Sequence, residues 1–381
     1  MNRTNAKRTD TKKPGTSLTP GTNLKKVPVL YSSSEEFSKY LAVSMVSLLD
    51  NKNEDTFYDI YVLIGEYYNE ESLIPFELMK QKYTNFSLNW VEVHDVFADT
   101  LVTDRGVGRE TLFRLLAAEK LPSVERCIYL DSDTMILNDL TEMYQFDIGD
   151  AYICGFYPRR MLSIWYQDYQ NNHGHNARRV MEKNMGLVAF DQYVGAGVMT
   201  MNLALIRRDH MTAKFLERVK PNTTPKDQDI LNACCYGHIA KLPIKYIIDL
   251  HDLDDLDWYA ENDEGFDELT EIQKALLNPV VIHYADKFKP WKMCGLRYEK
   301  QWWHYAVSLG LFDQIWGDFL DEIVTGNGVK SEFIRVSEGK SQTEIYQEAY
   351  AKFSKGISYR LGRFLTYIPR KIYYFLRGER I

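Results

Sequence analysis

The chain has 381 residues, of which 45% are apolar, and it carries a formal net charge of −7 at pH 7. That size allows one large domain or two small ones. The five cysteines show no paired spacing, which argues against a disulfide scaffold and indicates a reducing compartment. The body between the two basic ends is acidic, so we expect no nucleic-acid partner.

Basic residues are concentrated at the two ends of the chain. Residues 1–26 carry seven Lys or Arg, one Asp and almost no large apolar group, so we expect them to be disordered. Residues 354–381 carry seven Lys or Arg among six aromatic residues. This composition suits an anionic membrane surface, and a surface helix packed on the body is the alternative. Between the body and this tail, residues 306–353 are predicted to form a helical extension.

The sequence has no apolar segment near its N-terminus of the kind typical of a secretion signal. It also has no run of 18 apolar residues, so a spanning helix is not expected. We therefore predict a cytoplasmic protein that is held peripherally on the inner face of the cytoplasmic membrane by its basic, aromatic tail.

Strands and helices alternate along the first third of the chain. The hydrophobic pattern predicts strands at residues 27–31, 57–64, 86–93 and 125–130, and helices at residues 40–49, 70–83 and 110–120. Such alternation is typical of an α/β fold with a mostly parallel, doubly wound sheet. Ligands of such sheets bind beyond the carboxyl ends of the strands, and the segment Asp131-Ser132-Asp133 falls at such an end.

The second half of the chain is less regular. We predict strands at residues 151–156, 198–202 and 280–284, helices at residues 203–220 and 227–236, and an acidic loop at residues 250–257. Residues 157–193 form a polar, aromatic and basic excursion between two strands. We interpret this excursion either as a lid with an acceptor-binding cleft or as a solvated surface loop.

Two short segments carry the candidate chemistry. Asp131 and Asp133 follow an apolar strand two residues apart, so their carboxylates can converge on one ion, although surface turns also favour Asp. His283 ends a second apolar strand, where a histidine is often a core residue. We favour a ligand role for His283 because of Lys289, which lies six residues later. The rigid Pro-Trp pair that follows Lys289 holds it in place, so that it can offer a positive charge to a phosphate. Carboxylates with one imidazole suit Mn²⁺ or Mg²⁺, which predicts an enzyme acting on a nucleotide-activated substrate.

Six segments follow the order of motifs in a known family. They are residues 29–33 with 40–44, 110–115, 129–133, 195–203, 227–232 and 283–291. On these segments the chain resembles glycosyltransferase family 8, whose retaining enzymes include glycogenin and bacterial lipopolysaccharide galactosyl- and glucosyltransferases. The resemblance implies a GT-A fold at residues 27–305, which is a single Rossmann-like nucleotide-binding domain with a mixed, mostly parallel sheet. It also implies a UDP-sugar donor and Mn²⁺, with Mg²⁺ as the second option.

The resemblance also assigns roles to charged residues. It implies that Asp131, Asp133 and His283 are the metal ligands. Lys289 is similar to a diphosphate contact, and Arg114 is similar to a donor-site arginine near the phosphate or the sugar. These roles are expectations that depend on the resemblance.

The catalytic candidates are two neighbouring polar residues. Asp227 resembles the residue that holds the sugar's hydroxyl groups, and Gln228 resembles the residue on the reactive face of the anomeric carbon. Ser34, Gly195 and Asp286 depart from the family's usual Asp, Asn and Gly, which leaves the identity of the donor open. The remaining donor-binding candidates complete the set: Ser32, Ser34, Ser132, Gly195, Ala196 and Asp286.

The function implied is transfer of a hexose from UDP-glucose or UDP-galactose to a saccharide or glycolipid acceptor, with retention of configuration. The product would belong to lipopolysaccharide, capsule or another surface glycan. Because Gln228 is a poor nucleophile, we favour front-face attack, with Asp227 as the alternative nucleophile of a double displacement. Two other functions stay open: an inactive relative that binds a glycan or a partner enzyme, and a metal-dependent nucleotidyltransferase.

Overall fold

A computed structural model gives the structure of residues 24–93, 96–97, 108–156, 171, 192–219, 226–250, 266–285, 288–293 and 295–326. Several predictions fall outside these residues. They concern disorder at residues 1–23, most of the 157–193 excursion, nearly all of the acidic loop, Asp286, and the basic tail. At the end of the segment predicted to be disordered, Lys25 and Lys26 instead begin a strand, because they pair with the neighbouring strand at Thr56 and Phe57.

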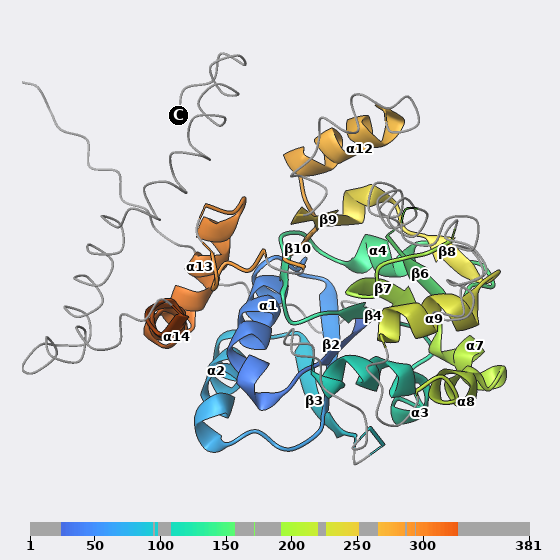
Figure 1. Cartoon of the computed structure of the whole chain (residues 1–381), viewed down its shortest axis with the longest axis horizontal. Helices are drawn as coiled ribbons and strands as arrows, with labels where there is room; N and C mark the ends of the chain where they lie inside the picture. The colour runs from blue at the N-terminus through green and yellow to red at the C-terminus, as the bar shows by residue number, and fades with distance from the viewer. Residues whose placement is uncertain are drawn as a thin grey trace, which may run out of the picture.

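A seven-stranded sheet forms the centre of the molecule, in the order β3-β2-β1-β4-β7-β6-β8 (Figure 1). Strands β3, β2, β1 and β4 run parallel, and β7 is antiparallel to both of its neighbours. The predicted α/β fold with a mixed, mostly parallel sheet is therefore confirmed. The strands are β1 (Lys25–Ser32), β2 (Thr56–Ile64), β3 (Phe86–Glu92), β4 (Cys127–Leu130), β6 (Ile153–Gly155), β7 (Val198–Met201) and β8 (Ile239–Lys241).

A second sheet of three short strands packs beside the first. Its order is β5 (Thr134–Ile136), β10 (Val281–His283) and β9 (Ile247–Asp249). Strand β10 is antiparallel to β5 and parallel to β9, and its last residue, His283, pairs with Thr134 on one side and Asp249 on the other. The sequence pattern predicts β10 but neither of its partners.

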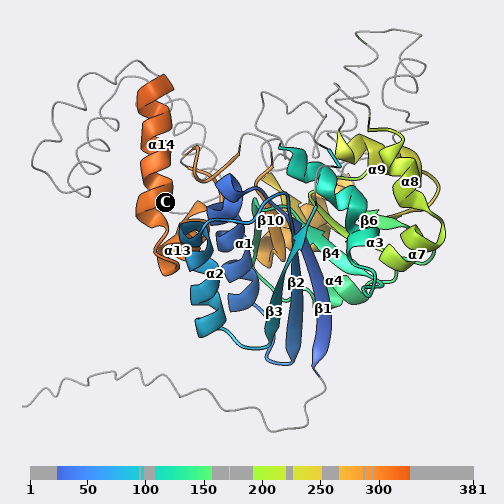
Figure 2. The same cartoon turned by 90° about the horizontal axis from the view of Figure 1, so that it is seen from below.

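Helices cover both faces of β1 and β2, whose side chains alternate between two cores. The helices α1 (Ser38–Asp50) and α2 (Glu70–Lys82) bury Val29, Tyr31 and Ile60, whereas the 3₁₀ helix η2 (Arg109–Leu116) and α3 (Ala117–Lys120) bury Leu30 and Leu63. Figure 2 shows α1 and α2 on one side of these strands and α3 on the other. Alternation with a period of two places successive residues in different cores, as expected for a sheet buried on both sides.

Two predicted helices differ in detail from those observed. Residues 109–120 begin as 3₁₀ helix and become α-helical only at Ala117. The single helix predicted at 203–220 is two helices, α7 (Leu203–Arg208) and α8 (Met211–Leu216), because His210 has a left-handed backbone with φ of 52°. An α-helix cannot continue through that conformation.

Three longer helices follow α9 (Asp227–Cys235) in the chain: α12 (Phe266–Leu277), α13 (Glu299–Ser308) and α14 (Phe312–Gly326). The other short helices are η1 (Glu35–Phe37), α4 (Thr141–Gln145) and η4 (Ile244–Tyr246). Residue 305 lies inside α13, and the predicted domain boundaries stay predictions. Among the described residues, no helix is both long and apolar enough to cross a membrane.

Helix α1 also contacts the outer side of β5. The Ile136 N–H donates to Ser47 Oγ at 2.9 Å, and Asn51 Nδ2 donates to the Ile136 carbonyl at 3.0 Å. Thr134 Oγ1 lies 3.0 Å from Ser44 Oγ in the same helix. These contacts fix the small sheet against a helix that packs on the large one.

Candidate metal and donor-binding centre

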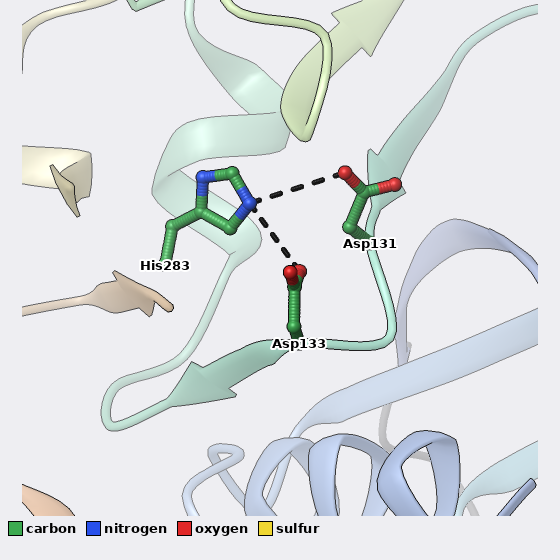
Figure 3. Close-up of side chains that lie close together, drawn as sticks. All are labelled: Asp131, Asp133 and His283. Carbon is green, nitrogen blue, oxygen red and sulfur yellow. Dashed lines mark ion pairs between the residues drawn. The ribbon is translucent and has the colours of Figure 1, made fainter. Parts of the chain in front are cut away.

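The two sheets meet at the segment between β4 and β5. Asp131 continues the large sheet, because its N–H donates at 2.7 Å to the carbonyl of Gly197, the residue just before β7. Asp133 continues the small sheet, because its carbonyl accepts the N–H of Tyr284 at 3.0 Å. His283, at the end of β10, then faces both aspartates across the junction (Figure 3).

Asp131, Asp133 and His283 form a compact group whose ligand atoms all lie within 4.8 Å of one another. His283 Nε2 is 3.3 Å from Asp133 Oδ1 and 3.9 Å from Asp131 Oδ2. The other imidazole nitrogen, Nδ1, is 3.3 Å from Asp249 Oδ2. The structure thus brings the three predicted metal ligands together, and it adds a third carboxylate, Asp249, that the sequence pattern does not indicate.

Three observations show that this group fits a divalent cation. Asp133 Oδ1 is buried and accepts no hydrogen bond from the described part of the chain. At Gly197, an added Cβ would lie 2.7 Å from His283 Nε2 and 2.8 Å from Asp131 Oδ2, so a side chain there would occupy the space among the ligand atoms. Two carboxylates and one imidazole are a donor set suited to Mn²⁺ or Mg²⁺.

Each aspartate uses one oxygen for a cationic side chain and turns the other toward His283. Arg114 Nη2 donates to Asp131 Oδ1 at 2.7 Å, and Lys289 Nζ donates to Asp133 Oδ2. Lys289 Nζ also donates to the Tyr284 carbonyl at 2.6 Å. The two cations therefore hold the carboxylates in place and offset part of their negative charge.

Arg114 is the central buried charge of the site, with a side chain only 3% exposed. Its Nε lies 3.1 Å from Asp227 Oδ2, and its Nη1 donates to the Ala196 carbonyl at 2.6 Å. The guanidinium lies 4.2 Å from the centre of the Tyr129 ring, a cation–π arrangement. Arg114 thus joins a predicted metal ligand to Asp227, the predicted sugar-binding residue.

Tyr129 is a site residue that the sequence analysis does not single out. Its hydroxyl donates to Asp131 Oδ1 at 3.0 Å and lies 2.7 Å from Ser32 Oγ. The ring is fully buried. Its position two residues before Asp131 on the same strand is the signal that could have found it, because alternate residues share one face.

Helix α9 holds the chain segment that precedes β7. Gln228 Oε1 accepts the Ala196 N–H at 3.0 Å, and Gln228 Nε2 donates to the Tyr193 hydroxyl at 3.0 Å. One turn later, Asn232 accepts the Val194 N–H at 2.7 Å and donates to the Val194 carbonyl at 2.8 Å. The spacing of four residues between Gln228 and Asn232 places both amides on one helix face.

Tyr193 and Asp229 complete the surroundings of Gln228. The Tyr193 hydroxyl donates to Asp229 Oδ1 at 2.5 Å while it accepts from Gln228. Both ends of the Gln228 amide are therefore in hydrogen bonds. The amide has a fixed orientation, in which its carbonyl oxygen faces the main chain of Ala196.

Lys289 owes its position to the residue pair that follows it. Trp291 is 3% exposed and stacks on Tyr40 of α1 with ring centres 3.9 Å apart. Trp302 of α13, which is fully buried, packs against Trp291 with ring centres 5.1 Å apart. This aromatic packing anchors the segment, as the sequence pattern predicts, and places the Lys289 ammonium beside Asp133.

Burial and charge shift the pKa values of the acidic and basic groups. Burial lowers the pKa of His283, but the Asp133 and Asp249 carboxylates outweigh it and raise that pKa to about 10. Burial raises the pKa of Asp131 and of Asp227. The pKa of Asp133 lies below its ordinary value, because Lys289 and His283 outweigh its burial. At neutral pH without a cation, His283 is therefore protonated.

The other predicted donor-binding residues lie at the ends of the elements around this centre. Ser32 ends β1 and is 8% exposed, and Ser34 precedes η1. Ser132 Oγ is buried and has no hydrogen-bond partner in the part of the chain that the structure describes. The Gly195 N–H donates to the Phe156 carbonyl at 2.9 Å. Roles in donor binding for these residues stay predictions.

The sequence also matches a known family directly. The sequence model of glycosyl transferase family 8 matches residues 28–295. The chain belongs to this family. The resemblance drawn from the six ordered segments is thereby confirmed, and membership identifies this family 8 protein as a glycosyltransferase.

Solved structures of similar fold support the GT-A architecture. The galactosyltransferase LgtC, solved in complex with donor and acceptor sugar analogs, is 20% identical with a TM-score of 0.58, and the match covers 74% of this chain and 96% of LgtC. The bifunctional glycosyltransferase WbbM is 20% identical with a TM-score of 0.63, over 79% of this chain and 53% of WbbM. At this identity, the similarity shows the fold.

One relative adds to the family assignment at the level of sequence. A Haemophilus influenzae protein named "Putative glycosyltransferase" is 25% identical over 214 residues, which are 55% of this chain. The match spans 60% of that relative's length, and the match to WbbM spans about half of WbbM. Substrates and partners of the whole protein are therefore matters for proposal.

Proposed function

We propose that this family 8 protein is a metal-dependent, retaining hexosyltransferase. Its donor is UDP-glucose or UDP-galactose, and its acceptor is a saccharide or glycolipid that becomes part of lipopolysaccharide, capsule or another surface glycan. The observation that carries the proposal is the group of Asp131, Asp133 and His283 within 4.8 Å, with Arg114 and Lys289 bonded to its carboxylates. A cation and two fixed positive charges match the needs of a diphosphate leaving group.

In this proposal Asp131, Asp133 and His283 hold a divalent cation, Mn²⁺ or Mg²⁺. When bound, the cation supplies Lewis-acid stabilisation of the negative charge that develops on UDP. Lys289 adds a second positive charge that is already positioned by the packing of Trp291. Arg114 is almost fully buried, so its part is to fix Asp131 and Asp227 and to add positive potential around them.

Asp227 and Gln228 are proposed to contact the donor sugar. Asp227 Oδ2 is paired with Arg114, whose charge opposes the effect of burial on the Asp227 pKa and orients the carboxylate to accept hydrogen bonds from sugar hydroxyl groups. Gln228 is a neutral amide fixed at both ends, and it is a poor nucleophile. The acceptor hydroxyl therefore attacks on the face from which UDP departs and gives its proton to the leaving phosphate, which retains the configuration. Attack by Asp227 is the alternative.

The test is release of UDP from a panel of UDP-sugars with a saccharide acceptor and Mn²⁺ or Mg²⁺. UDP release should require the cation, should stop with a chelator, and should be lost in Asp133→Asn. Asp209→Asn, which alters a carboxylate bonded to Tyr152 and Arg208, should retain activity. The anomeric configuration of the product, read by NMR, distinguishes retention from inversion.

Three results would contradict the proposal. Absence of UDP release with every donor, together with unchanged glycan binding in Asp133→Asn, indicates an inactive binding protein. Release of pyrophosphate from a nucleoside triphosphate indicates a nucleotidyltransferase. An inverted product contradicts front-face attack and the double displacement alike, because both retain configuration.

We also propose that residues 354–381 bring the enzyme to an anionic membrane surface, where glycolipid acceptors lie. The support is compositional: seven cations among six aromatic residues. Cutting the chain after Phe353 should abolish sedimentation with phosphatidylglycerol vesicles while the affinities for Mn²⁺ and UDP stay unchanged. Unchanged sedimentation of the shortened chain would contradict the membrane proposal.

A further inference from the structure

We propose that Asp249 is a positioning residue that orients the His283 imidazole toward the cation. The inference rests on the proposed metal-dependent function. His283 Nδ1 lies 3.3 Å from Asp249 Oδ2, while Nε2 faces Asp133 and Asp131. An imidazole whose Nδ1–H is donated to a carboxylate presents the lone pair of Nε2 to a cation in a fixed direction.

The strand pairing explains why Asp249 and His283 meet. Strands β9 and β10 are parallel and in register, so that His283 lies directly beside Asp249. Residues paired in this way project their side chains to the same face of the sheet. The two residues before Asp249, Ile247 and Ile248, are buried in the main core, at 4% and 3% exposure. The position of the carboxylate is thus set by a packed strand.

Asp249 lies on the wrong side of the ring to be a ligand itself. The compact group of ligand atoms consists of Asp131, Asp133 and His283, and among the described residues Asp249 is not part of it. The two imidazole nitrogens are separated by a ring carbon and point in different directions. Contact of Asp249 with Nδ1 therefore places its carboxylate away from the ion that Nε2 faces.

A second histidine–carboxylate pair in the chain provides a comparison. His238 Nδ1 lies 3.6 Å from Asp150 Oδ2, but the side chains are 47% and 92% exposed. Such a pair in solvent contributes little. The His283 and Asp249 side chains are 12% and 21% exposed, so water competes much less for their contact. The difference in burial makes Asp249, and not Asp150, a residue that can hold a ring in one orientation.

The experiment measures Mn²⁺ binding to the full chain, with no donor or acceptor present. The free Mn²⁺ signal in EPR gives the Kd, and pulsed EPR reports the nitrogen coupling of a coordinated imidazole. In D249A the Kd should rise about 10- to 100-fold and the nitrogen coupling should weaken. D249N keeps an oxygen that accepts the Nδ1–H, so its Kd should rise less than tenfold and its nitrogen coupling should persist. D150A, the matched control, should bind as the parent does.

A double-mutant cycle separates orientation from a general effect on the fold. In the H283A background, D249A should weaken Mn²⁺ binding no further, because the ring it orients is absent. Thermal unfolding of the metal-free variants checks that each is folded, and D249V, which suits a strand, replaces D249A if that variant is not.

The remaining outcomes contradict either the role of Asp249 or the proposed metal dependence. Parent-like Mn²⁺ affinity and nitrogen coupling in D249A overturn the role of Asp249 and leave the proposed function intact. Equal losses in D249A and D249N, or a further loss in the H283A background, also overturn the orienting role. Absence of Mn²⁺ and Mg²⁺ binding by the parent chain, with UDP released in a chelator, instead contradicts the proposed metal dependence.

Discussion

The large and the small sheet each supply part of the candidate metal centre, but they are built differently. Strands β1 and β2 of the large sheet have eight and nine residues and lie in two extensive cores, whereas each strand of the small sheet has three residues. Asp131 extends the large sheet, and Asp133 and His283 belong to the small one. A long, doubly covered sheet resists local opening better than short strands do. A bound cation would therefore join a rigid platform to a less stable partner.

The positively charged partners of Asp131 and Asp133 also differ in burial and in the kind of element that carries them. Arg114 holds Asp131 from within the core, with 3% of its side chain exposed and a second carboxylate, Asp227, on its other side. Lys289 holds Asp133 from a loop, with 14% of its side chain exposed. Replacing Arg114 or Lys289 by a neutral residue should show how much the stability of each sheet depends on that positive charge.

Replacing Arg114 by Met should have the largest effect on stability. It leaves the buried Asp227 carboxylate, and Asp131 with a side chain 27% exposed, without their counter-charge, which costs about 3–5 kcal/mol. Lys289→Met removes a charged hydrogen bond at a more exposed position and should cost about 1.5–3 kcal/mol. Urea unfolding of the metal-free proteins measures both free energies. An equal or greater loss in Lys289→Met would contradict the view that the large sheet carries the more costly buried charge.

Replacing Gly197 by Ala tests the junction between the sheets. The added Cβ would lie 2.4 Å from His283 Cε1 and 2.8 Å from Asp131 Oδ2, so the two ligands must separate. Overpacking of this kind typically costs about 1–3 kcal/mol, and we expect Mn²⁺ affinity to fall by roughly 100-fold. Gly195→Ala, whose Cβ meets only the Phe156 carbonyl at 3.9 Å among the described residues, should leave Mn²⁺ affinity unchanged. Isothermal titration calorimetry measures the Mn²⁺ affinity of both variants. Parent-like affinity in Gly197→Ala would show that the junction between the sheets can widen freely.

The smallest predicted effect concerns pH. Because the pKa of His283 is about 10 in the metal-free protein, its contacts with Asp133 and Asp249 stabilise the fold fully below its ordinary value of 6.5. That contribution is lost as pH rises through about 10. Mn²⁺ requires the unprotonated nitrogen, so its affinity should change in the opposite direction and rise up to about tenfold per pH unit between pH 7 and 8. Calorimetry in buffers of different ionisation enthalpy should detect the released proton, and a pH-independent Kd would contradict the prediction.

The contrast between the sheets also sets what the sequence can predict. Strands β1, β2 and β3 and helices α1 and α2 are long enough for their hydrophobic periodicity to reveal them, within one or two residues at each end. Strands β5 and β9, of three residues each, show no such period and are not predicted, whereas the equally short β6 and β10 are predicted from apolar runs. The break at His210 was missed for a different reason, since a left-handed histidine has no pattern in the surrounding sequence.

The candidate site divides in the same way. Asp131, Asp133 and His283 belong to motifs that keep their order in the family, and the structure brings them together as the motifs predict. Asp249, Tyr193 and Asn232 act through pairing with residues far away in the sequence. Their partners are defined by the register of short strands and by one helix face. A linear pattern of residue types does not contain that information.

The main-chain hydrogen bonds of Ile136, in the edge strand β5, bear on whether copies of this chain can aggregate by strand pairing. An outermost strand normally leaves a row of main-chain donors and acceptors open to intermolecular β-pairing, a common route to aggregation. Here the outward N–H and C=O of Ile136 are already taken by Ser47 and Asn51. Helix α1 and the residue after it occupy the hydrogen-bonding groups that a neighbouring strand would use. The β5 edge is therefore closed to strand addition without a charged residue or a proline to block it.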